Sequence, residues 1–249
     1  EGYFAPPTVF EGREGFLNLF SFKGGSHGYE PTLPHGINYP EKLTKDFGIK
    51  WEMADNSIKL HSCCRFTNNY CDCGIDIYNQ PGFDYRNVKS IHAEVNKFTD
   101  DKMCHPEDIK RHPVNIVNAQ FSLFYEIACA LVKGRVLPES FTEETIKDER
   151  ISKLCDLITW EISDEFEAVY PDRYPARVTV TMNDGSVYVG EVAYPKGDPE
   201  YPATREEVVE KFLNNAANTI GSVKAERIVE LVDRFETLEN IYELVECLH

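Results

Sequence analysis

The sequence predicts an α+β fold, in which a mixed block of strands and helices is inserted between segments of an all-helical domain. Three observations support this class. Glycine and proline concentrate in residues 1–40, strand-like alternation of apolar residues is confined to the middle of the chain, and apolar residues at helical spacing fill its end. We therefore expect a loop-rich segment of a helical domain over 1–57, an α+β domain over 58–202 and returning helices over 203–249.

The first elements follow from local pattern. One short helix is expected near Gly15–Phe20, within the loops. A longer helix is predicted over Asn68–Gln80, with Thr67 as its N-cap and Pro81-Gly82 as its stop. A strand follows over Val88–Phe98, and the residues that alternate in it are Ile91, Ala93 and Val95.

Segment 118–136 predicts the strongest helix, which Gly134 is placed to end in a left-handed cap. Its apolar face is formed at helical spacing by Phe121, Phe124, Ala128 and Leu131. A second face carries a hydroxyl, a phenol and a thiol, from Ser122, Tyr125 and Cys129. The residues alone favour a core tyrosine at Tyr125 whose hydroxyl has a partner, and a tyrosine that faces something else is the lesser alternative.

A hairpin and further helices complete the chain. Short helices are expected near Glu143–Leu154. The turn Asn183-Asp184-Gly185 predicts a β-hairpin, because alternating residues flank it, namely Val178, Val180 and Met182 before it and Val187 and Val189 after it. Thr204 and Glu207 form a capping-box pattern for the next helix, and a last helical run is expected over Ser222–Leu248.

Composition excludes several classes of partner. The formal net charge of -16, from 42 acidic and 26 basic residues, would repel a nucleic-acid backbone, and no basic run offsets it. No apolar run is long enough for a transmembrane helix, and the N-terminus lacks the features of a signal peptide. We expect a cytoplasmic protein that binds neither nucleic acid nor membrane.

Four of the eight cysteines lie in one stretch, KLHSCCRFTNNYCDC, which runs from Lys59 to Cys73. Its spacing does not match the paired ligands of structural zinc, because Cys63 and Cys64 are adjacent. Cys71 and Cys73, two residues apart on a helix, would point about 200° away from each other. We expect reduced thiols and no metal, although a metal or iron-sulfur site stays open as the lesser alternative.

The same stretch favours an anion site. With Thr67 as N-cap, the backbone donors of the first helical turn would lie beside Lys59, His61 and Arg65, and together they would attract a carboxylate. The alternative is that these charges are scattered on a loop and simply solvated.

Four stretches in order resemble one family, MmgE/PrpD, which includes 2-methylcitrate dehydratase, cis-aconitate decarboxylase and iminodisuccinate epimerase. They are PPTVFEGREGF, KLHSCCRFTNNYCD, AQFSLFYEIACALVKGRV and MNDGSVYVGEVAYPKGDPEYPATREEVVEKF. The resemblance implies a helical domain with a smaller α+β lid inserted near the C-terminus. This chain looks like the later half of that plan, so we expect the helical domain to be incomplete and the N-terminal helical half, which supplies a His and an Asp to the site, to lie elsewhere.

The resemblance also implies site residues. Lys59 matches a lysine at the lid edge that faces the substrate, and Tyr125 matches a tyrosine on a lid helix that borders the active-site cleft. Arg65 and Asp72 match a common pattern, CCRFTH followed by Asp. We therefore expect Lys59, Tyr125 and Cys64 at the catalytic positions. Substrate-binding positions are expected at Arg65, His61, Thr67 and Asn68.

Two of these positions depart from relatives. Asn68 stands where the common pattern has histidine, and an asparagine does not titrate near neutral pH. Cys64 stands where some members, such as the decarboxylase, have histidine.

The resemblance implies a cofactor-independent lyase, most simply a hydro-lyase, that acts on a small polycarboxylate such as 2-methylcitrate. Such chemistry needs cations to hold carboxylates and an acid and a base to move protons. The alternatives are an epimerase, isomerase or decarboxylase of the same family, and a non-catalytic subunit or degenerate paralogue. For partners we expect a homodimer, or a separate chain that supplies the N-terminal helical half.

Overall fold

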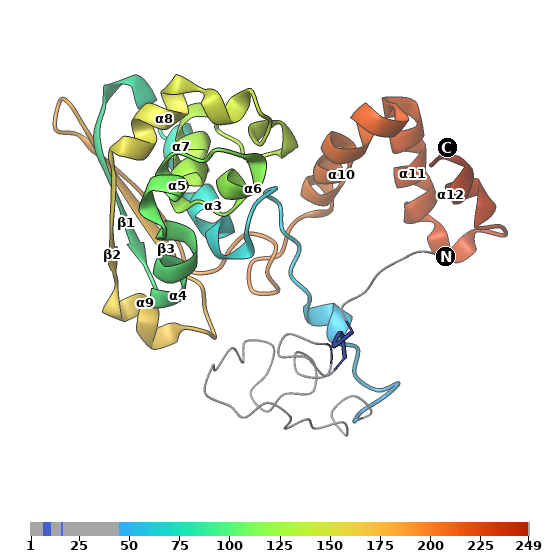
Figure 1. Ribbon diagram of the computed structural model, residues 1–249. Helices are drawn as coiled ribbons and strands as arrows, with labels where there is room; N and C mark the ends of the chain where they lie inside the picture. Colours follow the sequence, from blue (N-terminus) through green and yellow to red (C-terminus); the bar gives the residue numbers. More distant parts are fainter. Residues whose placement is uncertain (1–6, 11–15, 17–44, 249) are drawn as a thin grey trace. The chain divides into compact units, whose positions relative to one another are not determined.

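The computed structural model describes residues 7–10, 16 and 45–248 (Figure 1). The chain divides into two compact units, Glu1–Asn56 and Ser57–His249, and each is described by itself. In the described part of the first unit, a turn leads into the 3-10 helix η1 (Glu52–Asp55). The predicted helix near Gly15–Phe20 lies outside the described residues, except for Phe16.

The second unit is built on a four-stranded mixed sheet with the order β2-β1-β3-β4. β1 pairs with β2 in parallel, whereas the pairs β1-β3 and β3-β4 are antiparallel. The strands are β1 (Val88–Val95), β2 (Ile158–Ile162), β3 (Ala176–Met182) and β4 (Val187–Val192). This sheet and its helices confirm the α+β class.

Strand β1 confirms the predicted strand and its inward face, because Ile91, Ala93 and Val95 are all fully buried. The strand ends earlier than predicted. Asn96 accepts a hydrogen bond from Thr99 N at 2.8 Å and so caps the short helix α4 (Lys97–Thr99) that follows.

The hairpin is confirmed as well, with Gly185 in the left-handed region at φ 88°. Val187 and Val189, however, lie on the exposed face of β4. The other face approaches a helix so closely at Gly190 that a Cβ there would lie 2.3 Å from the carbonyl oxygen of Cys73. Glycine at that position is what allows β4 to pack on the helix.

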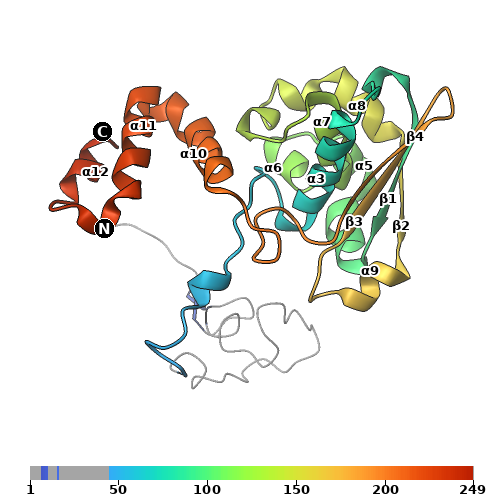
Figure 2. The ribbon, with the colours of Figure 1, turned by 180° about the vertical axis from the view of Figure 1, so that it is seen from behind.

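Two helices, α3 (Arg65–Asn79) and α7 (Leu123–Lys133), form the layer beside the sheet (Figure 2). α3 contacts β3 and β4 on one side and α7 on the other, and α8 (Glu149–Asp156) packs on α7. Gly74 allows close contact between α3 and α7, since a Cβ there would lie 2.6 Å from Ala130 Cβ. Every residue from Leu123 to Val132 is buried, so α7 is the centre of the core.

Two predicted helix boundaries are wrong. α3 begins at Arg65, so Thr67 is not its N-cap; the Thr67 hydroxyl instead donates to Cys64 O at 3.0 Å. The segment 118–136 is not one helix but two, α6 (Ile116–Gln120) and α7. Ser122 causes the break, because its hydroxyl accepts Tyr125 N at 3.0 Å as the N-cap of α7. Phe121 is consequently exposed rather than part of the apolar face.

The helices near Glu143–Leu154 are present as η5 (Thr145–Lys147) and α8, and Gly134 ends α7 in the left-handed conformation as predicted. The capping box of Thr204 and Glu207 is confirmed at the start of α10 (Arg205–Ile220). The expected last run over Ser222–Leu248 is divided into α11 (Ser222–Asp233), η6 (Phe235–Thr237) and α12 (Tyr242–Glu246). The other helices in the described part of the chain are η2 (Tyr85–Asn87), η3 (Asp100–Cys104), α5 (Glu107–Arg111), η4 (Pro138–Ser140) and α9 (Asp164–Val169).

No helix among the described residues combines the length and the apolar character that crossing a bilayer requires.

Candidate functional site

The loop before α3 carries the first candidate, Lys59. Hydrogen bonds from Cys64 N to Gln120 O at 2.9 Å and from Ser62 N to Val136 O at 3.3 Å fix this loop to the end of α6 and to the segment that follows α7. The Lys59 side chain is exposed, and its Nζ donates to Cys63 O at 3.1 Å. In the described part of the chain its ammonium therefore has a backbone partner but no carboxylate partner.

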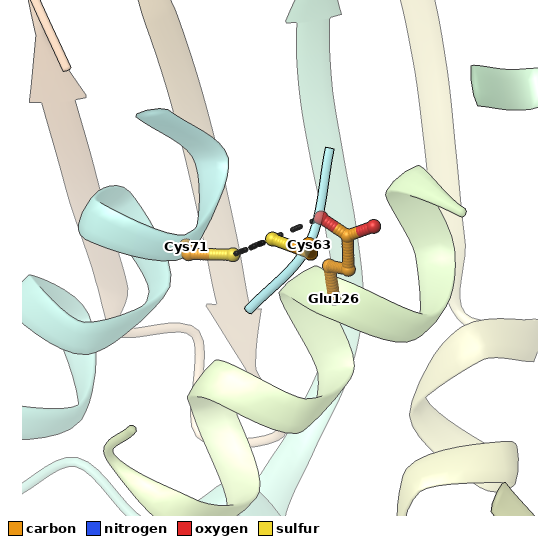
Figure 3. Close-up of side chains that lie close together, drawn as sticks. All are labelled: Cys63, Cys71 and Glu126. Atoms are coloured by element: carbon orange, nitrogen blue, oxygen red, sulfur yellow. Dashed lines mark hydrogen bonds between the residues drawn. The ribbon is translucent and has the colours of Figure 1, made fainter. Parts of the chain in front are cut away.

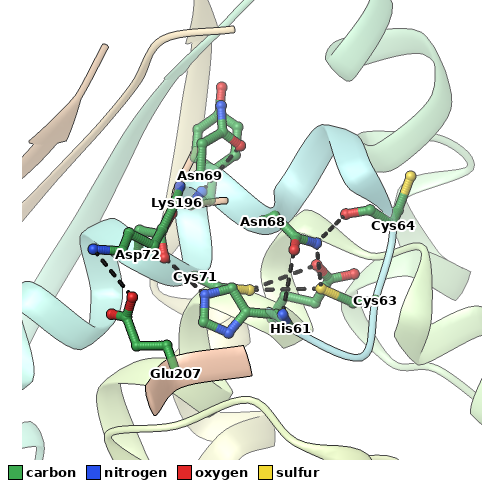
Figure 4. Close-up of polar contacts among 11 residues, drawn as sticks. His61, Cys63, Cys64, Asn68, Asn69, Cys71, Asp72, Lys196 and Glu207 are labelled. Atoms are coloured by element: carbon green, nitrogen blue, oxygen red, sulfur yellow. Dashed lines mark hydrogen bonds and ion pairs between the residues drawn. The ribbon is translucent and has the colours of Figure 1, made fainter. Parts of the chain in front are cut away.

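His61, on the same loop, is part of a polar network (Figure 4). Its Nε2 lies 2.8 Å from Asp72 Oδ1, and the other oxygen of Asp72 accepts Lys196 N at 2.9 Å. Lys196 Nζ in turn lies 3.3 Å from Glu207 Oε2. The Asp72 carboxylate thus joins the loop to the segment that precedes α10, and it holds the His61 ring in place.

Arg65, at the start of α3, is already paired. Its guanidinium forms an ion pair with Asp198 and lies 5.5 Å from the centroid of the Tyr174 ring. One guanidinium nitrogen, Nη1, is buried without a hydrogen-bond partner. A substrate carboxylate would therefore meet a guanidinium that is partly neutralised by Asp198, and not a free cation.

Thr67 and Asn68 hold the loop from inside. Asn68 is buried, its Oδ1 accepts His61 N at 3.3 Å, and its Nδ2 donates to Cys64 O at 2.7 Å and to Cys63 Sγ at 3.3 Å. Both hydrogens of the Asn68 amide nitrogen and its amide oxygen therefore have partners inside the protein. Thr67 is fully buried and bonded to Cys64 O, so both side chains position the loop.

The Cys64 thiol is also buried, and its burial raises its pKa. The nearby ammonium groups of Lys59 and Lys110 act in the opposite direction and lower this pKa, but burial dominates. A thiol in this state is protonated at neutral pH and is a weak nucleophile.

Tyr125 lies on α7 and borders a cavity of about 150 Å³. Its hydroxyl donates to Ser140 O at 2.6 Å, and burial raises its pKa. The cavity is lined by Arg111, His112, Pro113, Tyr125, Ile146, Lys147, Glu149, Ser152 and Cys155. Lys59 does not line it, so these two predicted catalytic residues do not share this cavity.

Sequence reasoning missed Glu126, which is fully buried beside Cys63 and Cys71 (Figure 3). Cys71 Sγ lies 3.9 Å from Glu126 Oε2 and 3.7 Å from Cys63 Sγ. Burial raises the pKa of Glu126 to about 8. A lone acidic residue in the apolar segment 123–132 was the available signal.

The opposite directions of Cys71 and Cys73 are confirmed. Cys73 Sγ contacts Ala176 O of β3 at 3.5 Å, whereas Cys71 faces Glu126 of α7. The convergence of Cys63 with Cys71 depends on the fold of the loop, which the spacing alone does not reveal.

Comparison with known proteins gives two findings. The family model described as MmgE/PrpD C-terminal domain matches residues 61–237, more than half of the chain. The chain is 28% identical over 262 residues to the Cis-aconitate decarboxylase-like protein oryM of Aspergillus oryzae (strain ATCC 42149 / RIB 40). That alignment covers 98% of this chain and 50% of the relative, so the chain spans about half the length of the curated relative that it matches.

Proposed function

The chain belongs to the MmgE/PrpD family, and from this we propose that it forms the C-terminal portion of a cofactor-independent hydro-lyase that acts on a small polycarboxylate such as 2-methylcitrate. The observation that carries the proposal is Lys59. It is an exposed ammonium without a carboxylate partner among the described residues, in a chain whose formal net charge is -16.

In the proposed reaction a base from the N-terminal helical half takes the proton next to a carboxylate, and the hydroxyl group then leaves as water with the proton that Tyr125 donates. Negative charge develops on the carboxylate oxygens as the proton leaves, and a nearby ammonium stabilises it most when water is excluded. Lys59 is assigned to this role. His61 and Arg65 are assigned to substrate carboxylates near it, with Asp72 and Asp198 holding their side chains in place.

Tyr125 is assigned as the proton donor to the leaving group. Its ordinary pKa is near 10 and burial raises it further, so the phenol carries its proton at neutral pH but is a weak acid until a neighbouring cation lowers this pKa. For this role the hydroxyl must leave Ser140 O, its present acceptor, and the cavity that it borders must open toward the substrate beside Lys59, which does not line it. Cys64, Thr67 and Asn68 are assigned to the wall of the site through the bonds that shape the loop.

Decarboxylation is the second candidate, and the named relative favours it, because that protein is called cis-aconitate decarboxylase-like. The same ammonium would stabilise the carbanion left when CO2 departs. An epimerase or isomerase would use the same proton removal and return the proton to the other face.

A panel of substrates separates these activities. The protein is purified through a tag on this chain from its own cells, and it is incubated with 2-methylcitrate and with cis-aconitate. A hydro-lyase forms an unsaturated product that absorbs in the far ultraviolet, a decarboxylase releases CO2, and an epimerase exchanges solvent deuterium without net product. The proposal would be contradicted if neither compound gave deuterium exchange, CO2 release or a change in absorbance.

A non-catalytic chain is the remaining possibility, and Asn68, which stands where the common pattern has histidine, favours it. In that case the proposed partner is a second polypeptide with the N-terminal helical half, whereas the family resemblance suggests a homodimer. The intact mass of the purified protein and any co-purifying polypeptide distinguish these cases. Activity that appears only after a second polypeptide is added identifies a subunit.

A further inference from the structure

Three potential metal ligands meet inside the core of the second unit, and they come from three separate segments. Cys63 lies on the loop before α3, Cys71 lies on α3 and Glu126 lies on α7. One ligand atom from each, two Sγ atoms and a carboxylate oxygen, lie within 4.8 Å of one another. Figure 3 shows the three side chains pointing toward a common point.

The spacing of these atoms suits one tetrahedral ion. Two sulfurs bound to the same Zn²⁺ at about 2.3 Å lie about 3.8 Å apart, and a sulfur and a carboxylate oxygen lie about 3.6 Å apart. The observed separations are 3.7 Å between the two Sγ atoms and 3.9 Å between Cys71 Sγ and Glu126 Oε2. Small side-chain rotations are enough to place all three around one ion.

An ionised Glu126 would need a cation in these surroundings. Glu126 and Cys71 are fully buried and Cys63 is nearly so, and Glu126 has no salt bridge among the described residues. Its neighbours are neutral donors, such as Ser122 N at 3.3 Å and the Cys71 thiol. A carboxyl group buried this way is costly when charged, unless a cation or a metal compensates it.

We propose that Cys63, Cys71 and Glu126 bind a divalent transition-metal ion with tetrahedral preference, of the Zn²⁺ class. Binding releases the two thiol protons and any proton on Glu126, because a metal binds the deprotonated forms. Two thiolates and one carboxylate leave the filled site with one net negative charge. Lys110, whose charge acts on Glu126, lies near enough to offset part of it.

The ion would fix the loop that carries Lys59. Asn68 Nδ2 donates to Cys63 Sγ at 3.3 Å, as groups around metal-bound thiolates do, and Lys59 Nζ donates to Cys63 O. Three protein ligands leave the fourth tetrahedral position to water. An open fourth position is typical of catalytic rather than of closed structural zinc sites, so the role proposed here rests on the contacts that the ion would fix in the loop, and it neither uses nor requires the lyase activity.

The test is binding of Co²⁺ and Zn²⁺ to the reduced 249-residue chain. Because the ligands are buried, each metal is supplied during refolding as well as to the folded protein. We expect about one Co²⁺ per chain with the thiolate-to-cobalt absorption of a tetrahedral site, displacement by Zn²⁺, and a melting temperature that rises with Zn²⁺.

Variants assign the site. Cys63→Ser and Cys71→Ser should abolish the absorption, and Glu126→Gln should weaken Co²⁺ binding by about tenfold or more. Cys129→Ser, which changes another buried thiol on α7, should leave binding unchanged. Circular dichroism checks that each variant folds. If a serine variant does not fold, Co²⁺ binding to Glu126→Gln decides whether the site is assigned correctly. No absorption in the parent chain, or binding that these three variants leave unchanged, would overturn the proposal.

Discussion

Asp72 joins the loop before α3 to the segment before α10 through its two carboxylate oxygens. One of its oxygens lies 2.8 Å from His61 Nε2 and the other accepts Lys196 N at 2.9 Å. Both partners are only partly exposed, so the loss of their acceptor would leave polar groups that water replaces poorly.

Asp72→Ala should therefore lower the free energy of unfolding by about 2 kcal/mol, measured by urea denaturation. Asp76→Ala is the matched control, because Asp76 lies on the exposed face of the same helix and, among the described residues, accepts a hydrogen bond only from Gln80 Nε2, at 3.2 Å. Equal stabilities of the two variants would refute the role given to Asp72.

At the scale of elements, the contact between α3 and α7 depends on Gly74. A Cβ there would lie 2.6 Å from Ala130 Cβ, well inside van der Waals contact. Gly74→Ala should gain helix propensity but still lower the free energy of unfolding, by about 1–3 kcal/mol, because the core is overpacked.

A second substitution on the facing helix should relieve this clash. Adding Ala130→Gly to Gly74→Ala removes the Cβ that the new alanine would contact, so α3 then carries the Cβ and α7 the glycine. The double variant should therefore recover much of the lost stability in the same denaturation experiment. If the double variant loses as much stability as the two single variants together, the helices do not meet at this point.

Helix α8 gives a prediction about pH. The Arg150 side chain, which hydrogen-bonds Asp148, lowers the pKa of Asp148, and Asp148 Oδ1 also accepts Arg150 N at 3.0 Å as the cap of α8. The folded state thus binds this proton less readily than the unfolded state. The carboxylate stabilises the fold above its ordinary pKa of 3.8, and this contribution is lost as the pH falls through the lowered value.

Asp148→Asn keeps the cap but removes the charge. Near pH 7 it should cost about 0.5 kcal/mol, as is typical of an ion pair near the surface. In urea denaturation the difference between the variant and the parent should shrink toward about pH 3. A difference that is constant over this range would mean that the charge of Asp148 does not contribute.

Elements set by local pattern were predictable from sequence. The strand at Val88, the hairpin around Gly185 and the capping box at Thr204 each depend on a few neighbouring residues. The break at Ser122 was not recognised, because a serine inside an apolar helical pattern reads equally well as an interior residue or as an N-cap. Tertiary packing decides between the two, since α7 is buried on every side.

For the whole molecule, the site could be predicted only where its residues are close in sequence. The pattern located Lys59, His61 and Arg65 on one loop and helix start. It did not reveal that Arg65 pairs with Asp198, which is 133 positions away. Likewise, Glu126 joins Cys71 across 55 positions. Such contacts follow from how the helices pack on the sheet, and no residue spacing encodes them.

The central claim is that the Lys59 ammonium stabilises negative charge on a polycarboxylate. The most direct test is kcat/KM of the purified protein for 2-methylcitrate, compared between the parent, Lys59→Ala and Lys89→Ala, which removes an exposed lysine on β1. We expect Lys59→Ala to lower kcat/KM by about tenfold or more and Lys89→Ala to change it by less than about twofold. An unchanged kcat/KM in Lys59→Ala would contradict the account.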